Sequence, residues 1–121
     1  MQRAHAPYSN FHVGAGICMS DGEVFAGCNV ESASYGLTQC AERSALSAAI
    51  AARGSLGPSS VVAVVIATES EAPTPPCGAC RQWLAEFAPL AAVISVSGDG
   101  TERRWSVKEL LPAAFTGDQL N

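Results

Sequence analysis

Three cysteines of this chain stand where helices are expected to begin. Cys40 precedes an alanine-rich stretch, and Cys77 and Cys80 open a second helical stretch that follows a proline-rich segment. The positive end of a helix dipole favours the thiolate, which is the form of cysteine that binds metal ions. Because Cys77 and Cys80 are three residues apart, they share one face of a helix and can hold a single ion.

The number and spacing of the cysteines exclude one kind of metal site and leave others open. The chain has five cysteines but one Cys-x-x-Cys pair, so a closed four-cysteine zinc site cannot be completed. Cys40, Cys77 and Cys80 offer three ligands, and catalytic zinc sites keep the fourth position for water. The spacing alone also allows a thiol redox pair of Cys77 and Cys80, or a non-catalytic zinc module with a fourth protein ligand. Cys18 and Cys28 lie in apolar stretches and are expected to be small buried residues.

Glu42 follows Cys40 by two residues and lies in the first turn of the expected helix. From there its side chain can reach a metal site placed beyond the helix end. A carboxylate beside a metal-activated water, without binding the metal, is in the position of a proton shuttle. The alternative is that Glu42 only complements the helix dipole as a first-turn acid.

The elements that must position these residues alternate along the chain. The expected strands span residues 12–19, 24–30, 61–68 and 92–96, and the expected helices span residues 40–53, 77–87 and 108–111. Asp21 and Gly22 predict a hairpin turn between the first two strands, and Gly54 predicts the end of the first helix. The order is β-β-α-β-α-β with a helical tail, which predicts an α/β fold with one sheet covered by helices.

Length and composition place limits on function. The 121 residues, 48% apolar and 15% charged, fit a single domain over residues 1–121 and exclude a disordered chain. A net charge of −4 lacks the basic character of a nucleic-acid binder, and no apolar run is long enough to span a membrane. We see no signal peptide, and cysteines that are not expected to pair suggest a reducing compartment, so we expect a cytoplasmic protein.

The motifs around the three cysteines resemble the zinc-dependent cytidine deaminase family. The segment Cys40-Ala41-Glu42-Arg43 is followed by Pro76-Cys77-Gly78-Ala79-Cys80-Arg81-Gln82. Further matching pieces are Pro7–Phe11, Val13–Ala15, Gly27–Glu31, Ala33–Gly36 and Glu109–Pro112. Cysteine as the first ligand is similar to the small, homotetrameric class that acts on free cytidine and deoxycytidine.

The resemblance implies a fold and a metal. The fold would have three layers, with a mixed central sheet covered by helices on both faces. One Zn²⁺ per subunit would be held by Cys40, Cys77 and Cys80. Glu42 would pass protons to the ring N3 and then to the leaving amino group.

The resemblance also implies residues that bind the nucleoside. Asn29 and Glu31 match a pair that hydrogen-bonds the ribose, Phe11 matches an aromatic residue of the base pocket, and Ala41 would offer backbone contacts to the pyrimidine. Ala33, Tyr35 and Phe115 match residues that reach a neighbouring subunit's site in the family's tetramer, which has shared active sites.

A cation is expected beside the metal. Three thiolates on Zn²⁺ carry a net charge of −1, which should make a bound water less acidic than it is beside neutral imidazoles. Arg43 is the best candidate to compensate by hydrogen-bonding the sulfurs. The alternative is a surface arginine on a helix.

These features predict a function. The chain would convert cytidine and 2′-deoxycytidine to the corresponding uridine nucleosides and ammonia, by zinc-activated water and a glutamate proton shuttle, in pyrimidine salvage. The alternative is a deaminase of a related cytosine nucleoside such as blasticidin S. A deaminase that edits polynucleotides should be basic and carry additional loops, unlike this short acidic chain.

Overall fold

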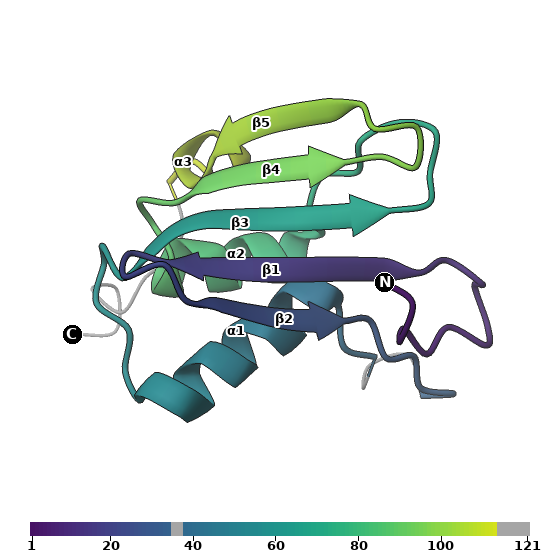
Figure 1. The fold of residues 1–121 in the computed structure, drawn as a ribbon, viewed down its shortest axis with the longest axis horizontal. Helices are drawn as coiled ribbons and strands as arrows, with labels where there is room; N and C mark the ends of the chain where they lie inside the picture. Colours follow the sequence, from purple (N-terminus) through teal and green to yellow (C-terminus); the bar gives the residue numbers. More distant parts are fainter. Residues whose placement is uncertain (35–37, 114–121) are drawn as a thin grey trace.

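The computed structural model describes residues 1–34 and 38–113 (Figure 1). Within them the strands are β1 (Val13–Met19), β2 (Val24–Cys28), β3 (Val61–Thr68), β4 (Ala92–Val96) and β5 (Glu102–Ser106). The helices are α1 (Ala41–Arg53), α2 (Gly78–Phe87) and α3 (Val107–Leu110).

The five strands form one mixed sheet in the order β2-β1-β3-β4-β5. β3 and β4 are parallel, and each other neighbouring pair is antiparallel. A parallel pair requires a crossover connection, which α2 provides between β3 and β4. β3 lies at the centre of the sheet, where runs of β-branched residues are common. The expected mixed sheet with helices is therefore confirmed.

The hydrophobic core lies between the sheet and its helices. Alternate strand residues point into it, among them Ile17 of β1, Ile66 of β3 and Val93 of β4. Ala41, Ala45 and Ala49 recur every fourth residue along α1 and are fully buried against the sheet. Small side chains on this stripe let α1 approach the strands closely.

Gly27 permits the closest approach between α1 and the sheet. A Cβ atom at this position of β2 would lie 2.4 Å from the Ala45 nitrogen and 2.7 Å from the Ala41 oxygen. Any larger residue would therefore push away the first turn of α1. Because Cys40 and Glu42 belong to this turn, Gly27 helps to set where they lie.

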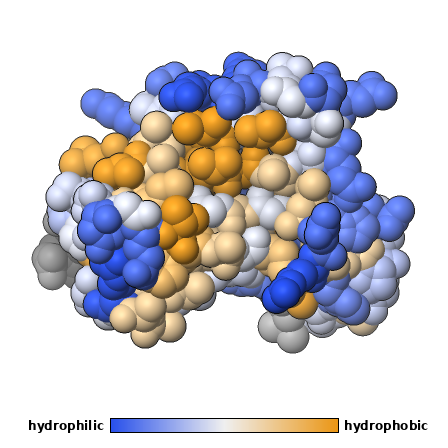
Figure 2. Space-filling view, in the orientation of Figure 1, coloured by the Kyte–Doolittle hydropathy of each residue, from blue (hydrophilic) through white to orange (hydrophobic). Residues whose placement is uncertain are grey.

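The three helices lie on one face of the sheet. α1 and α2 run behind the strands in Figure 1, and Val107 and Leu110 of α3 join the same core. Residues 1–34 and 38–113 supply helices to this one face, and the helical layer expected on the second face stays a prediction. The physical reason for the shared face is that α1 links β2 to β3 and α2 links β3 to β4. Both crossovers move in the same direction across the sheet, so right-handed connections pass over the same face. The second face carries half-buried apolar side chains, and Figure 2 shows apolar residues gathered over β3 and β4.

β5 is a strand that the sequence did not predict. Its residues are mostly charged, with Glu102, Arg103 and Arg104 in succession, so it has no apolar alternation. It becomes a strand by pairing with β4 at the edge of the sheet, where charged side chains are common. None of the helices in the described part of the chain is both long and apolar enough to cross a lipid bilayer.

Candidate active site

Cys40 and Cys77 are the N-cap residues of α1 and α2. Both have an extended backbone, and neither side chain makes a capping hydrogen bond to its own helix. Pro76 favours the extended entry to α2, and the alanine content of the next stretch favours α1. Both sulfurs are therefore left available to ligands. Cys80 lies in the first turn of α2 and is fully buried.

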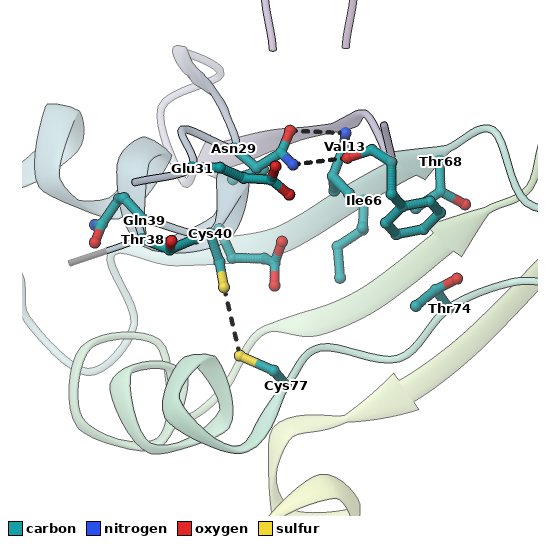
Figure 3. Close-up of a pocket in the computed structure, with 13 residues that line it drawn as sticks. Val13, Asn29, Glu31, Thr38, Gln39, Cys40, Ile66, Thr68, Thr74 and Cys77 are labelled. Carbon is teal, nitrogen blue, oxygen red and sulfur yellow. Dashed lines mark hydrogen bonds between the residues drawn. The ribbon is translucent and has the colours of Figure 1, made fainter. Parts of the chain in front are cut away.

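The sulfur atoms of Cys40, Cys77 and Cys80 form one cluster. All three lie within 4.8 Å of one another, and those of Cys40 and Cys77 are 3.6 Å apart and point toward each other in Figure 3. A tetrahedral zinc ion with Zn–S bonds of about 2.3 Å requires sulfurs about 3.8 Å apart. Three thiolates also suit the borderline-soft Zn²⁺. The donor set and its spacing therefore fit one zinc ion with a fourth position free for water.

Charge is unevenly shared in the cluster. Hydrogen bonds from Cys80, and then from Arg43, lower the pKa of Cys40 to about 5. Hydrogen bonding to Cys40, burial and the nearby Glu42 raise the pKa of Cys80. The N-terminus of α1 also favours a thiolate at Cys40, because the positive end of the helix dipole faces its sulfur.

Arg43 provides a positive charge against this sulfur. Its Nη2 donates to the Cys40 sulfur at 3.5 Å and to the Thr38 carbonyl at 3.4 Å. The hydrogen bond with Cys40 raises the pKa of Arg43. Its buried Nε has no hydrogen-bond partner among the described residues. Arg43 thus faces the cluster and does not extend into solvent as a surface arginine would.

Glu42 is a buried carboxyl group, with 4% of its surface exposed. Burial raises the pKa of Glu42 above its ordinary value, although a hydrogen bond from Cys80 opposes the shift. The side chain lines the same cavity as Cys40 and Cys77. A carboxyl group that can both accept and release a proton is therefore placed beside the sulfur cluster, away from bulk water.

One cavity unites the cluster with most of the expected nucleoside-binding residues. Its lining comes from the segment before β1, the end of β2, the entry to α1, β3 and the loop before α2. The lining residues are Phe11, Val13, Asn29, Glu31, Thr38, Gln39, Cys40, Ala41, Glu42, Ile66, Thr68, Thr74 and Cys77. Thus Phe11, Asn29, Glu31 and Ala41 all reach the cavity.

Asn29 and Glu31 hold the segment that carries Phe11. The Asn29 side chain accepts a hydrogen bond from the Val13 nitrogen at 3.0 Å and donates one to the Phe11 carbonyl at 2.8 Å (Figure 3). Glu31 accepts from the nitrogens of Tyr8 and Ser9 at 3.0 and 3.1 Å and from the Ser9 hydroxyl. The hydrogen bond from the Ser9 hydroxyl is the largest cause of the lowered pKa of Glu31. Both side chains therefore shape the cavity wall as well as lining it.

Of the other three expected site residues, the structure describes one, and it does not line this cavity. Ala33 is exposed and does not line it. Tyr35 and Phe115 lie outside the described residues. Since we expected all three to act at a neighbouring subunit, the single chain leaves their roles as predictions.

Sequence reasoning missed the polar residues that fix the loop before Cys77. Ser70 bonds the hydroxyls of Thr68 and Thr74, at 2.7 and 3.1 Å, and the Ser95 hydroxyl donates to the Thr74 carbonyl at 2.8 Å. Thr68 and Thr74 also line the cavity. Serine and threonine in a proline-rich loop suggest local hydrogen bonds, but the sequence does not reveal their partners.

Comparisons with known proteins agree on one family. The family described as "Cytidine and deoxycytidylate deaminase zinc-binding region" matches residues 1–96. The chain is 46% identical over 119 residues to a cytidine deaminase of Halalkalibacterium halodurans, covering 98% of this chain and 87% of the relative. The cytidine deaminase of Sporosarcina psychrophila is 38% identical over 121 residues, covering 99% and 86%. The crystal structure of cytidine deaminase from Burkholderia pseudomallei superposes with a TM-score of 0.89 at 48% identity, covering 94% of this chain and 89% of that one.

Proposed function

The chain belongs to the cytidine and deoxycytidylate deaminase family, and we propose that it converts cytidine and 2′-deoxycytidine to uridine and 2′-deoxyuridine. One water is consumed and one ammonia released, so a C4–O bond forms as the C4–N bond breaks. The observation that carries the proposal is the position of the buried Glu42 beside three sulfurs that leave one metal position open, all reached from one cavity.

Glu42 is the proposed proton carrier. Zinc held by Cys40, Cys77 and Cys80 would supply a water made acidic enough to act as a nucleophile near neutral pH. The Glu42 carboxylate takes up a proton within the cavity, delivers it to the ring N3 and later transfers a proton to the departing amino group. Its raised pKa suits a group that must be protonated for part of the cycle.

Arg43 is the proposed counter-charge of the sulfur cluster. Its hydrogen bond to Cys40 draws negative charge away from the metal position. A thiolate that shares its electrons with a guanidinium donates less to the metal, so the metal remains a stronger acid. Arg43 would thereby make three thiolates compatible with catalysis.

The nucleoside is proposed to lie with its sugar at Asn29 and Glu31 and its base between Phe11 and the entry to α1. Glu31 is an acceptor for a ribose hydroxyl, and Asn29 retains one amide hydrogen after its bond to the Phe11 carbonyl. The backbone of Ala41 would contact the pyrimidine edge. These residues would bind and orient the ring with its C4 toward the cluster.

Further proposals concern the assembly and its setting. Residues 1–121 would act as one domain, in a homotetramer in which Ala33, Tyr35 and Phe115 complete a neighbouring subunit's site. We place the enzyme in the cytoplasm, in pyrimidine salvage. A plain nucleoside is favoured over blasticidin S because Asn29 and Glu31 both line the cavity where the sugar would lie.

The test is ultraviolet detection of cytidine deamination by the wild type and Glu42→Gln, with zinc measured in both. Glu42→Gln should retain zinc and lose at least about 100-fold in kcat, within the usual contribution of general acid–base catalysis. Glu86→Gln, an exposed acid on α2, is the matched control and should retain full activity. A zinc-free wild type with full turnover would contradict the proposal, as would a Glu42→Gln enzyme of normal activity.

A further inference from the structure

Ser9 connects Glu31 and Phe11, two residues of the candidate site that belong to separate sequence motifs. The Ser9 hydroxyl donates a hydrogen bond to Glu31 Oε2. The Ser9 Oγ atom in turn accepts a hydrogen bond from the Phe11 nitrogen at 3.0 Å. One side chain therefore contacts both the carboxylate proposed for the sugar and the backbone of the aromatic residue proposed for the base. Ser9 itself is exposed and does not line the cavity.

The segment before Phe11 is folded so that Ser9 can make both contacts. The Asn10 nitrogen donates to the Ala6 carbonyl at 2.9 Å, closing a single turn, and Asn10 then adopts a positive φ of 56°. Asparagine tolerates this left-handed conformation better than most residues. The turn directs the nitrogens of Tyr8 and Ser9 at Glu31 and returns the chain toward the cavity at Phe11.

Counting acceptor positions shows what Ser9 does for Glu31. Oε1 receives two backbone N–H groups, which use its two lone pairs. Oε2 receives the Ser9 hydroxyl and retains one lone pair for a further donor. The Ser9 contact thus fixes the rotation of the carboxylate and the direction of its remaining acceptor.

We propose that Ser9 is a positioning residue that aligns Glu31 with Phe11, so that the sugar and the base are recognised in one fixed geometry. This inference rests on the proposed cytosine nucleoside function. The hydrogen bonds run in one direction, from the Phe11 N–H to Ser9 and from Ser9 to Glu31, and each strengthens the other. A donor to an ionised carboxylate makes a stronger bond than one between neutral groups.

Ser9→Ala removes both contacts but leaves the two backbone donors to Glu31. Discrimination in favour of the ribose hydroxyl that Glu31 binds should then fall about tenfold, the usual effect of losing a hydrogen bond to a charged group. The effect should appear mainly in KM, because the contact serves binding and not the chemical step. Ser9→Thr retains a hydroxyl and should restore the discrimination.

The experiment measures kcat and KM on cytidine and on its 2′-deoxy, 3′-deoxy and 2′,3′-dideoxy forms. The informative quantity is the ratio of kcat/KM for cytidine to that for each analogue, because general damage to the protein lowers all four values together and leaves the ratio unchanged. Ser59→Ala, an exposed serine in the turn before β3, is the matched control and should leave every ratio as in the wild type.

The outcomes separate this inference from the function on which it rests. A reduced ratio in Ser9→Ala, restored in Ser9→Thr, supports it. Unchanged ratios, or a Ser9→Thr enzyme that behaves like Ser9→Ala, overturn it. A wild type that deaminates all four nucleosides equally well also overturns it and leaves the deaminase proposal intact. A wild type inactive on cytidine refutes both.

Discussion

The sulfur atoms of Cys40 and Cys77 lie 3.6 Å apart at the adjoining N-termini of α1 and α2. Each residue is an N-cap, so two helix dipoles present their positive ends to one cluster of thiols. Residues 37 positions apart in sequence are thus brought to metal-binding distance by the packing of the helices on one face of the sheet.

This proximity of the two sulfurs predicts that zinc affinity depends on Cys77. Cys77→Ser should weaken zinc binding by more than about 100-fold, because loss of an outer partner alone weakens it 10–100-fold. Metal analysis after dialysis against a chelator measures the change, and the loss of zinc should lower the midpoint of thermal unfolding. Cys18→Ser is the matched control, since Cys18 is outside the cluster and should leave zinc unchanged. Equal zinc retention by both variants would rule out the three-sulfur site.

Arg43 gives a second prediction about the cluster. Arg43→Ala should reduce zinc affinity or kcat by about 10–100-fold, because Cys40 loses its only described cationic partner. Arg43→Lys should be intermediate, since an ammonium retains the charge but not the planar fork. Arg53→Ala, at the other end of α1, is the control and should retain both zinc and turnover. Wild-type turnover and metal content in Arg43→Ala would show that the contact with Cys40 has no catalytic role.

Much of the fold followed from local patterns. The β-branched run of β3 and the hairpin turn at Gly22 were predictable because each rests on nearby residues. β5 was not, because Arg103 and Arg104 form a strand only through their pairing with β4. The arrangement of all described helices on one face depends on strand order, which no local pattern contains.

Some features of the candidate site could likewise be predicted from local spacing, and others could not. The cysteines and Glu42 could be proposed from their spacing, since two expected helix starts carried them. That Ser9 reaches Glu31 across 22 positions could not be proposed, because it requires the register of the segment before β1 against the end of β2. The hydroxyl contacts of Ser70 and Ser95 were hidden for the same reason.

Gly27 gives a prediction about stability. Gly27→Ala should lower the free energy of unfolding by about 1–3 kcal/mol or more, because its Cβ would overlap backbone atoms of α1. Urea unfolding measures the loss. Gly16→Ala on neighbouring β1 is the matched control: its Cβ would meet only the Val24 side chain at 3.5 Å, an ordinary contact. The packing argument fails if the two variants are equally stable.

Asp99 provides a prediction about pH in the turn between β4 and β5. The Ser97 hydroxyl, and then the Thr101 N–H, lower the pKa of Asp99 from 3.8 to about 2. A carboxyl group whose pKa is lower in the folded state stabilises the fold above its unfolded pKa, and this contribution is lost as the pH falls through the folded pKa. The stabilisation by Asp99 should therefore be complete above about pH 4 and disappear toward pH 2.

Carboxyl NMR titration checks the assignment directly. The Asp99 resonance should titrate near pH 2 in the wild type. In Ser97→Ala it should move toward its ordinary value, because the hydroxyl is the largest cause of the shift, whereas Ser59→Ala should leave it unchanged. Asp99→Asn should remove this part of the acid-dependent loss of stability in urea unfolding. An Asp99 that titrates near 3.8 in the folded wild type would show that the turn does not hold its carboxylate.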